Sequence, residues 1–163
     1  LKIPFLRPAA LATDFSGTRE VLLHAIDFYA EKLGKNFSKI CLLQPTSPLR
    51  TSIHILEAHK LWDDSLDMVV SVKESKENPY TLNTENTKGF LEILKKNNLT
   101  RRQEFPKFWK YNGAIYFINI NSLIRKDISE FKKVKKYVMS DRDSLDIDNK
   151  MDFDLVSIYL KRN

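Results

Sequence analysis

A short acidic segment near the end of the chain contains the residues best suited to chemistry. Residues 143–152 hold four aspartates, whereas the whole chain has a formal net charge of +6. If residues 145–148 are extended, Asp146 and Asp148 point to the same side, with Cα atoms about 6.6 Å apart. Two carboxylates at this spacing can bind one Mg²⁺, which keeps some waters and takes its other ligands from substrate phosphates. The spacing therefore suggests a magnesium-dependent site for a phosphorylated substrate.

The same segment also has a purely structural interpretation. Asn149 followed by Asp152 resembles a capping box ahead of a helix, so we expect Asp152 to serve the helix N-terminus. Short acidic runs are also common in turns and caps. From spacing alone, both interpretations of Asp146 and Asp148 stay open.

The amino-acid composition limits the classes of protein to which this chain can belong. With 163 residues, 42% hydrophobic and 29% charged, the chain fits one globular domain with a core. No apolar run is long enough for a membrane span, and the N-terminus lacks a signal-peptide pattern. Cys41 is the only cysteine, which excludes an intrachain disulfide, and we expect a cytoplasmic protein. The positive charge suits an anionic small molecule, while no aromatic-interleaved basic motif favours nucleic acid.

The hydrophobic pattern predicts an α/β fold with a mostly parallel sheet. The continuous apolar run at 39–43 predicts a strand buried on both faces. A helix over 53–62, capped by Thr51 or Ser52, and a strand over 67–72 follow, which together form a βαβ unit. The proline-rich loop 44–50 follows the first of these strands directly, at the end of the sheet where ligands bind in open α/β folds.

The remaining elements are predicted from periodicity and capping residues. Residues 74–99 are polar and are expected to leave the core. The other predictions are a helix over 18–33 with Ser16 as N-cap and Gly34 as stop, a strand over 114–120 after a break at Asn112-Gly113, a helix over 122–125 capped by Asn121, a strand over 135–139, and a helix over 153–160 with Leu155, Val156, Tyr159 and Leu160 inward.

Four segments, taken together, resemble the CMP–sialic acid synthetase (acylneuraminate cytidylyltransferase) family. They are Leu6-Arg7-Pro8 with Leu11-Ala12-Thr13-Asp14, Leu43-Gln44-Pro45-Thr46-Ser47-Pro48-Leu49-Arg50, Arg102-Gln103 through Pro106 to Asn112-Gly113-Ala114-Ile115-Tyr116, and Ser144-Leu145-Asp146-Ile147-Asp148. The resemblance covers residues 6 to 155. It implies a Rossmann-like nucleotidyltransferase fold, a homodimer, and a Mg²⁺-dependent reaction of CTP with a nonulosonic acid that gives the CMP-sugar and pyrophosphate.

The resemblance also implies roles for single residues. Asp146 and Asp148 match the catalytic carboxylates that hold the metal ion. Arg7 and Thr18 match nucleotide-binding positions. The substrate-binding positions are matched by Gln44, Arg102 (with Arg101 as a one-residue ambiguity), Asn112 and Tyr116. By the same resemblance, residues 74–110 form a dimerisation excursion within a single partial domain, 1–163, and place Arg102 in the neighbouring subunit's site.

This sequence differs from the family pattern at the N-terminus. The family begins with a strand and a loop of small residues, Arg and Lys that cradles the CTP phosphates, and nothing similar precedes Leu6 here. We therefore expect the chain as given to bind CTP poorly and to show negligible synthesis. The alternatives are a non-catalytic dimerisation or binding module of the same fold, or a cytidylyltransferase for legionaminic, pseudaminic or Kdo acid. The Kdo-specific branch lacks a loop like 44–50.

Overall fold

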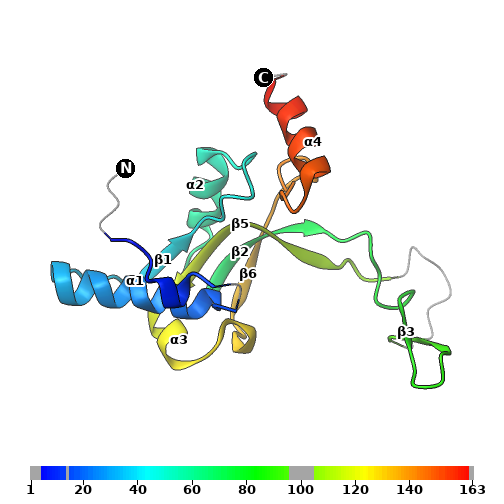
Figure 1. Ribbon diagram of the computed structural model, residues 1–163, viewed down its shortest axis with the longest axis horizontal. Helices are drawn as coiled ribbons and strands as arrows, with labels where there is room; N and C mark the ends of the chain where they lie inside the picture. Colours follow the sequence, from blue (N-terminus) through cyan, green and yellow to red (C-terminus); the bar gives the residue numbers. More distant parts are fainter. Residues whose placement is uncertain (1–4, 14, 96–104, 162–163) are drawn as a thin grey trace.

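A four-stranded sheet forms the centre of the computed structural model, which describes residues 5–13, 15–95 and 105–161 (Figure 1). Arg101 and Arg102 lie outside the described residues. The strand order is β1–β5–β2–β6. The strands are β1 (Lys39–Leu42), β2 (Met68–Glu74), β5 (Trp109–Asn119) and β6 (Val134–Val138).

The sheet is mixed, which refines the expectation of a mostly parallel one. Strand β2 pairs with β6 in parallel, but β1 and β2 each pair with β5 antiparallel. Strands β1, β2 and β6 therefore share one direction, and β5 lies between β1 and β2 with the opposite direction. The α/β class holds, while the two strands of the expected βαβ unit are separated by a strand that comes later in the chain.

Helices cover both faces of the sheet. Alternate residues of β2 point to opposite sides, so Met68 and Val70 join one apolar cluster and Val69 joins the other. Helix α1 (Thr18–Leu33) packs on the first cluster through Leu22, and α2 (Ser52–Lys60) packs on the second through Ala58. Strand β1 has an exposed residue and only partly buried neighbours, so the expectation that it is buried on both faces was wrong.

The helix boundaries largely follow the sequence signals. Helix α1 ends at Gly34, which has a φ of 60° in the left-handed region, and Thr51 caps α2 as predicted. The predicted N-cap of α1 was wrong: Gly17 takes that place, because the Ser16 hydroxyl bonds within the preceding loop. Helix α3 (Ile120–Arg125) is capped by Asn119 rather than Asn121, since the strand before it ends earlier than expected.

Helix α4 (Lys150–Lys161) begins with the predicted capping pair. Asn149 Oδ1 accepts hydrogen bonds from the backbone N–H of Met151 and of Asp152, and Asp152 Oδ2 accepts one from the backbone N–H of Asn149. The expected inward face was wrong in part: Val156 is buried, but Leu155 is 41% and Leu160 54% exposed. This helix extends away from the sheet (Figure 1, red), so little of its apolar surface is covered.

Between β2 and β5 the chain forms an arm away from the sheet (Figure 1, green). It carries an antiparallel hairpin of β3 (Asn83–Glu85) and β4 (Leu91–Ile93), whose residues are exposed. Single 3-10 turns occur at η1 (Ala9–Leu11) and η3 (Ile128–Glu130). Among the described helices, none combines the length and apolar character needed to cross a membrane.

Candidate active site

The site forms around an irregularity in the pairing of β2 with β5. Val70 pairs with Tyr116 and Val72 with Tyr111, so two steps along β2 correspond to five along β5. The additional residues of β5 bulge at Gly113, whose φ is 78°. The predicted break at Asn112-Gly113 is therefore a bulge inside a longer strand. Bulges of this kind redirect side chains beside functional sites.

Gly113 lies where the 44–50 loop and the acidic segment 143–152 come together. A Cβ atom at this position would lie 2.6 Å from Gln44 Oε1, 3.3 Å from Asp146 Oδ2 and 3.3 Å from Ser47 Oγ. The structure thus brings Gln44, at the end of β1, next to Asp146, which lies about a hundred residues later in the chain. Only a residue without a side chain leaves room for this convergence.

Backbone and side-chain hydrogen bonds hold these loops together. Arg50 Nη1 donates to the carbonyl oxygen of Gln44 at 3.1 Å and to that of Ala114 at 2.7 Å, which fixes the 44–50 loop against β5. The backbone N–H of Ile147 donates to the carbonyl oxygen of Thr46 at 2.9 Å. The acidic segment is therefore tied directly to the loop that carries Gln44.

Asn112 is the buried centre of a polar network. Its Nδ2 donates to Ser144 Oγ at 2.8 Å, and its Oδ1 accepts from Ser71 Oγ at 2.6 Å and from the backbone N–H of Ala114 at 3.2 Å. The side chain is 4% exposed and its second amide hydrogen faces Met139 Sδ. These contacts make Asn112 a positioning residue, and its predicted contact with substrate stays a prediction.

Asp146 and Asp148 line one cavity of about 220 Å³. They lie in an irregular segment between β6 and α4, not in a strand. Asp148 is exposed and Asp146 is half-buried. The other residues of the cavity wall are Lys73, Lys110, Tyr111, Asn112, Ser144, Leu145 and Asp152.

One carboxylate oxygen of this aspartate pair has the environment expected of an atom that binds a metal ion or a substrate. Asp146 Oδ1 is buried and has no hydrogen-bond partner among the described residues. Such an atom costs about 1–3 kcal/mol unless a ligand or ion satisfies it. Within the described ranges no group of three or more His, Cys, Asp or Glu side chains is arranged to hold a metal ion. Two carboxylates completed by water and phosphate fit Mg²⁺, whereas a closed protein cage is not present there.

Tyr116 lies on β5 close to this carboxylate. Burial raises the pKa of its phenol, and the negative charge of Asp146 and the nearby Tyr111 raise it further. The phenol is therefore neutral at physiological pH and can donate a hydrogen bond. Its ring meets that of Tyr111 edge-on, with centroids 6.3 Å apart.

The two predicted nucleotide-binding residues do not line the Asp146 cavity. Arg7 is exposed, and its Nε donates to the carbonyl oxygen of Leu11. Thr18 is the exposed first residue of α1. Their roles, like that of Arg102, stay predictions.

Sequence reasoning missed Lys73 and Lys110, which line the cavity beside the two aspartates. The available signal was weak: Lys73 comes directly after the apolar run 67–72, and Lys110 precedes the Asn112-Gly113 pair. Their juxtaposition depends on the pairing of β2 with β5, which the sequence pattern did not predict.

Comparison with known proteins gives relatives over nearly the whole chain. No protein-family model matches it. The chain is 34% identical, over 97% of its length, to an N-acylneuraminate cytidylyltransferase of Escherichia coli, of which it spans 37%. It is 29% identical to a CMP-N,N'-diacetyllegionaminic acid synthase of Legionella pneumophila, of which it spans 70%, and 27% identical to a flagellin modification protein B of Campylobacter coli, of which it spans 67%.

Proposed function

Because the chain belongs to the CMP–sialic acid synthetase family, we propose that it acts in the transfer of CMP from CTP to a nonulosonic acid, with release of pyrophosphate. The observation that carries this proposal is the convergence of Gln44 and Asp146 over Gly113, with Asp148 in the same cavity wall as Asp146. A polar amide close to one carboxylate of the pair suits a reaction in which a sugar hydroxyl meets a nucleotide phosphate.

The residues have separate tasks in this reaction. The sugar's anomeric hydroxyl attacks the α-phosphorus and pyrophosphate leaves, so the protein mainly orients the reactants and offsets charge. Asp146 and Asp148 would hold Mg²⁺, which when bound offsets the negative charge of the phosphates. Gln44 offers both a donor and an acceptor to sugar hydroxyl or amide groups, and the neutral phenol of Tyr116 offers a donor. Arg102 would pair with the sugar carboxylate, and Arg7 and Thr18 would contact the nucleotide.

The substrate class follows from the relatives' names, which specify N-acylneuraminic and diacetyllegionaminic acids. We propose an N-acylated nonulosonic acid as the sugar and a cytoplasmic enzyme that works as a homodimer. The arm supports the dimer proposal, because its hairpin region exposes large apolar side chains, namely Phe90, Leu91, Ile93 and Leu94.

A paramagnetic probe tests the metal site without requiring turnover. Mn²⁺ should selectively broaden the amide NMR signals of residues 113 and 144–148. Asp146→Asn and Asp148→Asn should each remove this selectivity while the remaining spectrum stays unchanged. Asp154→Asn is the matched control, because Asp154 is an exposed aspartate of α4 paired with Lys150. Selective broadening that persists in both site variants would exclude the pair as metal ligands.

Turnover tests the reaction itself. The complete natural protein should release pyrophosphate from CTP with a panel of nonulosonic acids, and Asp148→Asn should abolish release while the protein remains folded. Absence of release with every nonulosonic acid would contradict the proposed function, whatever the Mn²⁺ result.

A further inference from the structure

Two lysines face each other in the wall of the Asp146 cavity. Lys73 on β2 and Lys110 on β5 are direct partners in the antiparallel ladder, and both line the cavity with Asp146 and Asp148. Like charges placed directly opposite each other destabilise a strand pair. The pairing therefore calls for an explanation other than stability.

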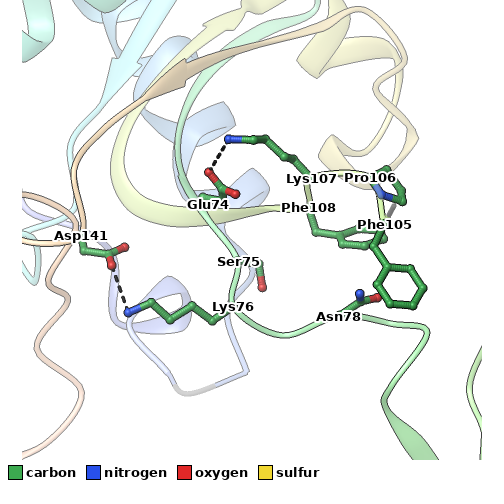
Figure 2. Close-up of a pocket in the computed structure, with 9 residues that line it drawn as sticks. All are labelled: Glu74, Ser75, Lys76, Asn78, Phe105, Pro106, Lys107, Phe108 and Asp141. Carbon is green, nitrogen blue, oxygen red and sulfur yellow. Dashed lines mark hydrogen bonds and ion pairs between the residues drawn. The ribbon is translucent and has the colours of Figure 1, made fainter. Parts of the chain in front are cut away.

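The neighbouring lysines show what ordinary surface lysines do in this region. Lys76 pairs with Asp141 at 3.2 Å and Lys107 pairs with Glu74 at 3.0 Å, as Figure 2 shows. Within residues 5–13, 15–95 and 105–161, Lys73 and Lys110 form no such ion pair. Their charge is left available to a ligand in the cavity.

The cavity continues into a longer groove. Lys73, Lys110 and Leu145 also line a second cavity of about 340 Å³. This second cavity shares Glu74, Ser75, Lys76 and Asp141 with a third, of about 410 Å³. Phe105 and Phe108 also line this third cavity (Figure 2). The lysine pair thus lies where the groove from the base of the arm reaches the two aspartates.

We propose that Lys73 and Lys110 form an anion subsite that binds a negatively charged group of a substrate beside the carboxylate pair. This inference rests on the proposed function, whose substrates offer two such groups, a nucleotide or pyrophosphate phosphate and the sugar carboxylate. A lysine ammonium is a compact charge that binds either group. The wall of this cavity also holds Asp152, so the two lysines offset two of its three carboxylate charges. A cation at the carboxylates and an anion at the lysines can therefore bind together there.

Binding measurements distinguish the two sources of the anion. Inorganic pyrophosphate with Mg²⁺ and N-acetylneuraminate are titrated separately by calorimetry, and KM is measured separately for CTP and for the sugar acid in the complete natural protein. Lys73→Gln combined with Lys110→Gln should weaken one of the two ligands at least about tenfold. Loss of pyrophosphate affinity and a raised KM for CTP assign a phosphate, whereas loss of sugar affinity assigns the carboxylate.

The controls separate an anion subsite from a structural role. Lys76→Gln and Lys107→Gln remove lysines of the same groove and should change either affinity less than twofold. The double variant should unfold at the same or higher denaturant concentration, because it relieves repulsion between like charges. Unchanged affinities and KM values in a wild-type enzyme that turns over would overturn the subsite and leave the proposed function standing. A wild-type enzyme that binds neither anion would overturn both.

Discussion

Asn112 on β5 donates a 2.8 Å hydrogen bond to Ser144 Oγ, and this bond joins the bulge to the acidic segment two residues before Asp146. Both side chains are buried, Asn112 being 4% and Ser144 1% exposed. A buried hydrogen bond of this kind fixes geometry because neither partner has water as an alternative. The position of the carboxylate pair therefore depends on the Asn112 amide.

We expect Asn112→Ala to cost about 3 kcal/mol in the free energy of unfolding, because it leaves the hydroxyls of Ser71 and Ser144 without their amide partner. Urea denaturation measures this loss. The selective Mn²⁺ broadening at residues 144–148 should weaken as well, since the segment is no longer held. Asn121→Ala, at an exposed asparagine of α3, is the control and should leave both properties near wild type. Equal effects of the two substitutions would contradict the positioning role of Asn112.

Local elements were predictable because their signals are local. The apolar spacing and Gly34 predicted the observed bounds of helix α1, and Thr51 predicted the N-cap of α2. The insertion of β5 between β1 and β2 was not predictable in the same way, because strand order depends on pairing between distant segments. The exposure of Leu155 and Leu160 was missed for a related reason: periodicity marks an apolar face of α4 but does not say what covers it.

In the candidate site too, some residues could be identified from the sequence and others only from the pairing of distant segments. Residue type and resemblance singled out Gln44 and Asp146, and the structure brings their side chains to one glycine. The network role of Asn112 was hidden, because an Asn-Gly pair in sequence indicates only a turn. Lys73 and Lys110 carry no local signal, since only the register of β2 against β5 makes them neighbours.

Gly113→Ala should cost about 1–2 kcal/mol in the free energy of unfolding, because an L-residue at a φ of 78° is strained. The added Cβ would also lie 2.6 Å from Gln44 Oε1, so the Gln44 side chain must leave its present position over Gly113. We therefore expect weaker binding of the sugar acid by calorimetry, in addition to the loss of stability.

Gly34→Ala is a matched control for this substitution. Gly34 has a φ of 60°, but a Cβ there would meet nothing within 4 Å. It should lose a similar amount of stability and keep wild-type sugar binding. If both variants bind the sugar acid as wild type does, the contact of Gln44 with the substrate is wrong.

Asp67 is a buried carboxylate directly before β2, and it does not line the Asp146 cavity. Its oxygens accept hydrogen bonds from Ser122 Oγ at 2.7 Å and from the backbone N–H groups of Lys132 and Lys133 at 3.0 Å, and Lys126 pairs with it at 3.0 Å. Burial alone raises the pKa of Asp67, but these bonds to the charged form outweigh burial and hold the pKa well below its usual value. The folded state therefore favours the ionised carboxylate.

A lowered pKa in the folded state makes Asp67 a source of stability that is present above the unfolded-state pKa of about 3.9 and is lost as the pH falls below it. Asp67→Asn should cost about 2 kcal/mol in the free energy of unfolding at pH 7 and clearly less at pH 3, measured by urea denaturation at both values. Glu31→Gln, at an exposed position of α1, serves as the control and should change little at either pH. An equal loss for Asp67→Asn at pH 7 and pH 3 would show that the carboxylate charge is not what stabilises this corner of the fold.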